Sequence, residues 1–433
     1  MTRKMKDSGI EWIGEIPEDW EISKFKNSSN LYVGDSIKDN EKDNYLDKDD
    51  AKAYVATKDL IIDENMVDFS NTLYVKNDNL KFKTAPKGSS LICIEGGSAG
   101  RKKAFLDRDV CFVNKLCCIN PLNSMDKKYM FYLISNQAFE QEFDKYIQGL
   151  IGGVSINKLS NFNIPLPTLK EQHKVSSFLD NEVNKINISI GYIYEQIENL
   201  KNYKKSAITE AVTKGLDKNV EMKDSGIEWI GEIPKHWSVT YLKSFFDEGK
   251  NKNKLGGETN LLSLSYGEII KKDINTQTGL LPKNFNNYNI VEEGSIIIRP
   301  TDLQNDKKSL RTGLVNERGI ITSAYINLKP KKNVASKYFH YLLHCYDLMK
   351  VFYNMGSGVR QGLIYSEFSK LLVLSPNSLE QEQIISYLDR KTKLIDDSIA
   401  IKQKQLETLE EYKKSLIYEY VTGKKEVNDG EET

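Results

Sequence analysis

The stretch Met5–Pro17, MKDSGIEWIGEIP, returns letter for letter at Met222–Pro234, and Trp20 returns as Trp237. All four tryptophans of the chain lie in these two copies. Internal repetition has to be interpreted before any other pattern, because it sets the number of structural units. The repeat predicts one unit built twice within 433 residues, and two copies of one task.

A second repeat lies near the end of each half. Residues 171–213 align without a gap on residues 380–422, where EQHKVSSFLD matches EQEQIISYLD and NYKKSAITEAVT matches EYKKSLIYEYVT. The intervening segments diverge. The expected division is a conserved tryptophan motif (1–20), a first variable domain (21–170), a conserved helix (171–214), a linker with the second tryptophan motif (215–237), a second variable domain (238–379), a second conserved helix (380–423) and a polar tail (424–433).

The second repeat has the pattern of a long helix with a coiled-coil seam. It contains no proline, and over much of it apolar residues recur at steps of three and four, namely Val175, Leu179, Ile186, Ile190, Ile193, Ile197 and Leu200. The other copy keeps the seam at Ile384, Leu388, Ile395, Ile399, Leu406 and Leu409, with Lys402 as a polar interruption. Each helix packing only on its own domain is the alternative. A helix of this length would extend roughly 65 Å, beyond such a domain, so the two helices are predicted to pair with each other, antiparallel.

Both variable segments combine short β-rich runs with a helical stretch. The runs SLICI at 90–94 and SIII at 295–298 are typical of strands, and 127–146 and 336–353 are typical of helices. These features follow in the same order in both segments. The predicted fold class is α+β, with two similar variable domains of mixed strands and helices. We expect two long helices to separate them as an antiparallel coiled coil with intramolecular pseudo-twofold symmetry.

Composition favours an ordinary water-soluble protein. No run approaches the roughly 18 apolar residues of a membrane span, and the polar start lacks the apolar core of a signal peptide, so a cytoplasmic location is expected. Five cysteines without a CxxC pair argue against a disulfide framework or a zinc ribbon. The net charge is zero, yet residues 238–379 carry 19 Lys and Arg against 12 Asp and Glu, whereas residues 21–170 carry 21 against 20.

Several catalytic signatures are missing from the sequence. There is no Pro-Pro dipeptide for an amino-methyltransferase motif and no GxxxxGK[ST] phosphate-binding loop. His340 and His344 with Cys345 have a spacing that can face a metal from a helix, but Tyr341-Leu-Leu343 between them indicates core, so no metal site is predicted. Because His173 aligns with Glu382, the repeat contains no duplicated catalytic histidine there.

The whole arrangement resembles the specificity subunit of type I restriction–modification enzymes. The resemblance is carried by GIEWIGEIPxxW at 9–20 and 226–237, by the helix starts ending in FLD and YLD at 165–180 and 376–389, and by YKKS at 203–206 and 412–415. It covers residues 5–423. The resemblance implies a DNA-binding, non-catalytic subunit in which each variable domain reads one half of a split, asymmetric DNA target, with the helices as the spacer.

The same resemblance implies which partners carry the chemistry. Two modification subunits would methylate adenine with S-adenosylmethionine, and restriction subunits would use ATP and Mg²⁺ to translocate and cut double-stranded DNA. No cofactor and no catalytic residue is expected in this chain. DNA modification in host defence is the implied role.

Glycine loops are the strongest candidates for DNA contact. Arg101 follows Gly-Gly-Ser-Ala-Gly, and Arg360 follows Gly-Ser-Gly-Val, where backbone amides and a guanidinium can approach a phosphate or a base edge together. Ordinary turns are the alternative. The predicted contacts are Thr57, Lys58, Gly97, Ser98, Arg101, Lys102, Gly153 and Ser155 in the first domain, and Ser265, Tyr266, Arg299, Thr301, Ser357, Arg360 and Gln361 in the second.

Two other functions stay open at this point. A coiled-coil adaptor that binds proteins would suit the neutral net charge, and a specificity subunit of a related system that cleaves on both sides of its site would share this organisation. The tryptophans also have two interpretations. They can form docking surfaces for a partner, or core contacts that close each domain onto a helix, which is the interpretation we favour.

Overall fold

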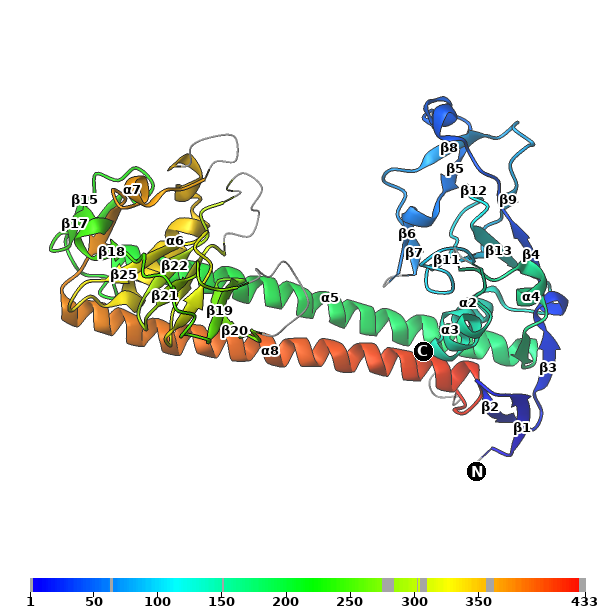
Figure 1. Cartoon of the computed structure of the whole chain (residues 1–433). Helices are drawn as coiled ribbons and strands as arrows, with labels where there is room; N and C mark the ends of the chain where they lie inside the picture. The colour runs from blue at the N-terminus through cyan, green and yellow to red at the C-terminus, as the bar shows by residue number, and fades with distance from the viewer. Residues whose placement is uncertain are drawn as a thin grey trace. The chain divides into compact units, whose positions relative to one another are not determined.

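The computed structural model describes residues 3–62, 65–149, 152–274, 284–301, 303, 310–355 and 362–427. It divides into two compact units, of which unit 1 contains residues 1–193 and 403–433 and unit 2 contains residues 194–402. Figure 1 labels the elements of both. Among the described residues, no helix has the length and apolar composition that a membrane span needs.

The variable domain of unit 1 is built on two four-stranded sheets. One has the order β11-β10-β13-β4, and the other has the order β8-β5-β12-β9 with β12 parallel to β5. The strands are β4 (Ser29–Val33), β5 (Ala51–Val55), β8 (Leu73–Lys76), β9 (Thr84–Ala85), β10 (Ser90–Cys93), β11 (Lys103–Phe105), β12 (Val110–Phe112) and β13 (Leu116–Pro121). All four residues of β10 are buried, which is why this strand is a continuous apolar run rather than an alternating one.

Three helices cover the first sheet of unit 1, and each begins at a side-chain cap. They are α2 (Lys127–Ser135), α3 (Gln137–Lys145) and α4 (Ile156–Ser160), capped by Asp126, Asn136 and Ser155. The sequence predicted one helix over 127–146, and that prediction was wrong at Asn136. This residue leaves the helical conformation and its side chain accepts a hydrogen bond from the Phe139 amide at 2.8 Å, so a second helix starts there.

The variable domain of unit 2 repeats this architecture. Its sheets have the orders β18-β25-β22-β23 and β20-β19-β24-β21, with β19 parallel to β24. The elements are β18 (Phe246–Glu248), β19 (Leu261–Ser265), β20 (Glu268–Lys272), β21 (Asn289–Val291), β22 (Ile296–Ile298), β23 (Thr312–Leu314), β24 (Gly319–Ile321), β25 (Ile326–Pro330), α6 (Ser336–Leu348) and α7 (Tyr365–Phe368). The same strand order with the same parallel pair confirms two similar α+β domains.

The two long helices, α5 (Leu169–Lys214) and α8 (Ser378–Val421), each begin in one unit and end in the other. In unit 1, the rings of Phe178 and Tyr420 lie 4.5 Å apart and Lys413 Nζ lies 3.1 Å from Asn187 Oδ1. In unit 2, Lys402 Nζ lies 2.5 Å from Gln196 Oε1 and Lys204 Nζ lies 2.6 Å from Asp396 Oδ2. In each unit, residues later in α5 contact residues earlier in α8. The two helices therefore run antiparallel, which confirms the predicted pairing.

Both long helices start two residues earlier than expected, because a polar residue caps each of them. The Thr168 hydroxyl accepts from the Glu171 amide at 3.3 Å, and the Asn377 amide oxygen accepts from the Glu380 amide at 3.0 Å. Ser, Thr, Asn and Asp satisfy the free N–H groups of a first helical turn in this way. The seam residues Leu179, Ile384 and Leu388 are fully buried.

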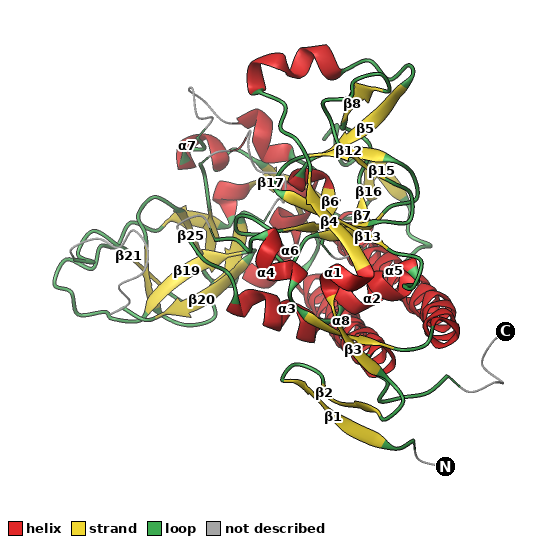
Figure 2. Ribbon diagram, turned by 90° about the vertical axis from the view of Figure 1, so that its right-hand side faces the viewer, coloured by secondary structure: helices red, strands yellow, loops and turns green. Residues whose placement is uncertain are grey.

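Each tryptophan motif forms a β-hairpin, β1 (Met5–Ile10) with β2 (Gly14–Pro17) and β15 (Met222–Asp224) with β16 (Glu232–Pro234), and Figure 2 shows the first pair. The first hairpin packs on the end of α8, where Tyr418 Oη donates to Ile13 O at 3.2 Å. The second packs on the end of α5, where Lys214 Nζ donates to Glu232 O. Short pairs β3 (Glu21–Lys24) with β14 (Asn163–Leu166), β17 (Ser238–Tyr241) with β26 (Leu372–Ser375) and β6 (Leu60–Ile61) with β7 (Met66–Val67) complete the strands.

Candidate nucleic-acid interface

The glycine loop between β10 and β11 in the first variable domain has a fixed shape. Its base is closed by two hydrogen bonds of 2.8 Å, from Cys93 N to Lys102 O and from Gly100 N to Cys93 O. Gly100 has a positive φ of 75°, and a Cβ on it would lie 2.7 Å from the Phe143 ring, so only glycine fits. The loop therefore holds the exposed Arg101 at a defined position.

Two other segments join this loop. The amide of Gly96 donates to Gly152 O at 2.7 Å, and Lys102 Nζ donates to Thr57 O at 2.8 Å. The structure thus brings into one connected group all the contacts predicted for the first domain, which are Thr57, Lys58, Gly97, Ser98, Arg101, Lys102, Gly153 and Ser155. Whether they touch DNA stays a prediction.

These residues do different things within the group. The Ser155 hydroxyl accepts from the Lys158 amide at 3.3 Å, so it caps α4 as well as lying at the surface. The ammonium of Lys102 donates a hydrogen bond to the backbone carbonyl of Thr57, and the side chain is half-buried. Within the described residues the guanidinium of Arg101 makes no hydrogen bond or ion pair, which leaves it available to an anion.

The group has a positive electrostatic character. Burial raises the pKa of Asp59, and Lys58 and Lys102 oppose that rise. Burial also raises the pKa of the Cys93 thiol, and Lys102 and Lys115 oppose it. Lys115 is a cation that the sequence reasoning missed. It sits in the tight turn between β12 and β13, and a lysine in a turn gives no signal of its own.

The second variable domain arranges its corresponding loops in the same way. The amide of Arg299 donates to Arg311 O at 2.9 Å, as Cys93 does to Lys102, and Leu363 N donates to Pro300 O at 2.9 Å, as Val154 does to Ile94. Thr301 is exposed and Arg299 is half-buried. Ser357, Arg360 and Gln361 lie outside the described residues.

The hairpin turn between β19 and β20 carries Ser265 and Tyr266. Tyr266 has a φ of 49° and is 75% exposed, and Gly267 follows with a φ of 85°, a pair of left-handed residues typical of a two-residue hairpin turn. A Cβ on Gly267 would lie 3.4 Å from the Leu310 side chain, next to Arg311 in the chain. The turn therefore lies beside the start of β23 in the second domain.

Arg311 is a functional residue that the sequence reasoning counted only as one basic residue among several. Its side chain is fully buried, and Nη1 donates to Arg299 O at 3.1 Å and to Thr301 O at 2.5 Å. Its backbone amide donates to the buried carboxylate of Asp347 at 2.8 Å. Arg311 therefore fixes the backbone of the 299–301 loop. Only the three-dimensional structure reveals this, because the bonded atoms are backbone carbonyls on another strand.

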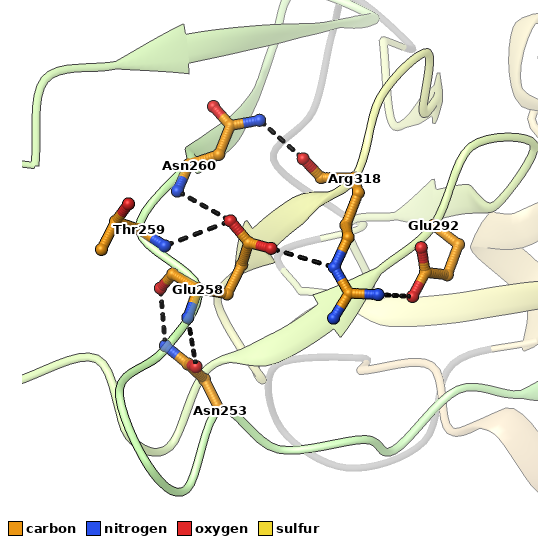
Figure 3. A network of polar contacts seen from close by, with 6 residues as sticks. All are labelled: Asn253, Glu258, Thr259, Asn260, Glu292 and Arg318. Carbon is orange, nitrogen blue, oxygen red and sulfur yellow. Dashed lines mark hydrogen bonds and ion pairs between the residues drawn. The ribbon is translucent and has the colours of Figure 1, made fainter.

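Arg318 is held by two carboxylates, as Figure 3 shows. Its Nε lies 3.0 Å from Glu258 Oε2 and its Nη1 lies 2.6 Å from Glu292 Oε1. Glu258 also accepts from the Asn260 amide, and these two contacts keep the pKa of its carboxyl below the ordinary value. Arg318 thus stabilises the loop before β19, which makes it a structural residue rather than a free cation.

The histidine pair considered as a metal site lies in the core of unit 2. Burial lowers the pKa of His340 to about 4, and burial also lowers the pKa of His344 to about 4. In the part of the chain that the structure describes, no three His, Cys, Asp or Glu side chains are grouped so that they could hold a metal ion.

Comparison with known proteins supplies the deciding observation. Residues 17–199 match the family model of the type I restriction modification DNA specificity domain. Two proteins of Methanocaldococcus jannaschii align over nearly the whole chain. One is a candidate type I restriction enzyme MjaX specificity subunit, which is 25% identical over 95% of each chain. The other is the type I restriction enzyme MjaVIII specificity subunit, which is 24% identical over 94% of this chain and 93% of the relative. The chain is therefore similar to type I restriction–modification specificity subunits over nearly its whole length.

Solved structures share the fold of this chain. A chain from a study of complex assembly and conformational transition of the type I restriction–modification system superposes with a TM-score of 0.71 at 12% identity, covering 94% of this chain and 99% of the other. The HsdS subunit of Thermoanaerobacter tengcongensis superposes with a TM-score of 0.52 at 14% identity, covering 94% and 98%. At these identities the likeness concerns the fold.

Three of the four tryptophans in the chain fit the core interpretation. Trp12, Trp20 and Trp237 are buried, and Trp20 Nε1 donates to Glu171 Oε2 at 2.9 Å. For Trp229 the interpretation was wrong, because this side chain is 43% exposed although its local sequence is identical to that of Trp12. The difference arises from what surrounds each hairpin and cannot be seen in the repeat itself.

Proposed function

We propose that this chain is the specificity subunit of a type I restriction–modification complex and reads a bipartite, asymmetric DNA sequence, with one variable domain for each half-site. The observation that carries the proposal is that one fold occurs twice with different side chains at matching positions. The loop bond from Cys93 to Lys102 matches that from Arg299 to Arg311, but Lys102 is partly exposed whereas Arg311 is fully buried. Two domains of one shape and unlike surfaces suit two unlike half-sites.

Charge supports a nucleic-acid ligand in both domains. Residues 238–379 carry 19 Lys and Arg against 12 Asp and Glu. In the balanced first domain, the cations Lys58, Arg101, Lys102 and Lys115 gather around one glycine loop. Cations of this kind bind phosphates and orient a protein on the duplex, while other side chains read the bases.

The proposal assigns the chemistry to partner subunits. Two modification subunits bring S-adenosylmethionine and methylate adenine, and restriction subunits bring ATP and Mg²⁺ and cleave DNA, in the cytoplasm. The repeated tryptophan motif supports two equivalent docking sites. Its exposed Glu15 recurs as the exposed Glu232, and among the described residues neither side chain makes a hydrogen bond or ion pair that would explain the recurrence.

The experiment is to co-express the chain with the modification subunit encoded beside it and to map methylated adenines by sequencing the host DNA. We expect a split motif. Replacing residues 21–170 with the first variable domain of another specificity subunit should change one half of the motif only, and replacing residues 238–379 should change the other half. A stable complex with an active methyltransferase but no motif would favour the protein-binding adaptor instead.

A further inference from the structure

A hollow of about 570 Å³ opens beside the glycine loop of the first variable domain. It is lined by Val33, Ile94, Glu95, Asn114, Gln148, Gly149, Gly152, Gly153, Val154, Ser155 and Ile156. Apart from Ser155, the polar side chains that line the hollow are those of Glu95, Asn114 and Gln148. None of these three residues was among the predicted DNA contacts. Their chemistry therefore needs an explanation of its own.

The backbone holds these three side chains at fixed positions around Gly153. Gly153 forms isolated antiparallel bridges with Glu95 on one side and with Gln148 on the other. A Cβ on Gly153 would lie 3.0 Å from Ile94 O, so the close approach of the segments depends on glycine. Asn114 lies in the tight turn closed by the bond from Leu116 N to Val113 O at 3.0 Å, and Ile94 N donates to Lys115 O, which fastens this turn to the same segment.

The three polar side chains have unused hydrogen-bonding capacity. Among the described residues, the side chains of Glu95, Asn114 and Gln148 make no hydrogen bond or ion pair, and Asn114 and Gln148 are exposed. Asparagine and glutamine amides bind adenine through N6 and N7, and a carboxylate accepts a hydrogen bond from N4 of cytosine. Lys102 and Lys115 are close enough to the adjacent Cys93 to oppose the rise that burial causes in the pKa of its thiol, and cations at such positions can bind phosphates.

We propose that this hollow reads base edges of the first half-site in the major groove, with Asn114 and Gln148 directed at adenine and Glu95 directed at cytosine. The inference rests on the proposed function and extends it to specificity-determining residues. Cations around the hollow bind the backbone of the duplex, and the hollow itself carries the sequence information.

The second domain has different chemistry at the matching places. Its bond from Leu363 N to Pro300 O corresponds to the bond from Val154 N to Ile94 O, so Thr301 occupies the position of Glu95. Its turn bond from Tyr325 N to Thr322 O corresponds to that from Leu116 N to Val113 O, so Ser323 occupies the position of Asn114. Hydroxyl groups replace a carboxylate and an amide, which is what two domains with different half-sites require.

The test uses isosteric substitutions that exchange acceptor and donor groups while the full chain stays in its complex with the modification subunit. Glu95→Gln should shift preference at one position of one half-site from C·G toward A·T, and Asn114→Asp and Gln148→Glu should shift it from A·T toward C·G. A good bidentate contact is worth roughly 5- to 150-fold in discrimination, so the mapped motif should change visibly. The other half-site should be unchanged.

Glu21→Gln and Asn30→Asp are matched controls, because both residues are exposed in the same domain, lie outside the hollow and undergo the same charge changes. The controls should keep the wild-type motif. If the three hollow variants also keep it at every position, the inference is overturned while the proposed function stands. If the wild-type chain gives no split motif at all, the proposed function itself fails, so the two failures are distinguishable.

Discussion

Removing the guanidinium of Arg311 should loosen the 299–301 loop and damage recognition by the second domain only. In Arg311→Met the carbonyls of Arg299 and Thr301 lose a charged donor at 3.1 and 2.5 Å. A hydrogen bond to a charged group contributes about 1.5–3 kcal/mol, so losing both should cost about 3 kcal/mol or more. Because every 1.4 kcal/mol is tenfold, the loop should open roughly 100-fold more often or more.

The assay is hydrogen exchange of the Arg299 and Leu363 amides, which the loop protects through bonds of 2.9 Å each. Arg311→Lys is the conservative control. It retains the charge and one of the two contacts, so it should exchange at an intermediate rate. In the methylation map, Arg311→Met should broaden one half-site and leave the other intact. Wild-type exchange at both amides in Arg311→Met would refute the reasoning, as would equal damage to both half-sites.

Three further outcomes are expected. The pKa values of His340 and His344, about 4 in the folded chain against 6.5 when exposed, mean that the unfolded chain binds more protons between these values. Stability of unit 2 should therefore be complete above pH 6.5 and decrease by up to about 3 kcal/mol per histidine as the pH falls to 4, and replacing both with phenylalanine should flatten a urea-unfolding series over pH. Gly100→Ala should destabilise unit 1 by about 1–3 kcal/mol, since its φ of 75° and a Cβ contact at 2.7 Å both oppose a side chain, and unchanged thermal unfolding would contradict this. Trp12→Ala should lower the melting temperature, whereas Trp229→Ala should spare it and weaken binding of the modification subunit, and the opposite pattern in calorimetry and pull-down would reject the assignment of Trp229 as exposed docking surface.

The repeat and the heptad-like seam were sufficient to predict the main architecture. Because Leu179 and Leu388 recur at helical spacing over a length that no single domain can cover, helix pairing followed from the sequence. The structure brings the residues of the early glycine loop into one connected group because Gly100 and Gly153 allow close approach of the chain, but their contact with DNA stays a prediction. A local sequence pattern predicts a structural feature when residues close together in the sequence determine that feature.

Other features depend on contacts between segments distant in sequence. Arg311 was indistinguishable from an exposed cation, because its partners are backbone carbonyls. Trp229 was expected to be buried like Trp12 because the sequence around both residues is identical. The exposure of each side chain depends on the segments that surround its hairpin, and these differ. Glu95 and Asn114 gave no signal in the sequence because they are far apart along the chain and only the folded backbone places both at the lining of one hollow.

The composition of the two units has a consequence for biosynthesis. Unit 2 is one continuous segment, 194–402, whereas unit 1 combines residues 1–193 with 403–433. The core of unit 1 includes Leu416, Ile417 and Val421. The N-terminal part of unit 1 therefore cannot complete its core until the last part of the chain has been synthesised. At about 5–20 residues per second, the ribosome needs roughly 10–40 s to synthesise the intervening segment. During that interval the apolar seam of the first helix is exposed to solvent. Unit 2 should therefore complete its folding before unit 1, although the synthesis of unit 1 begins first. The nascent first domain is the part that most needs a chaperone.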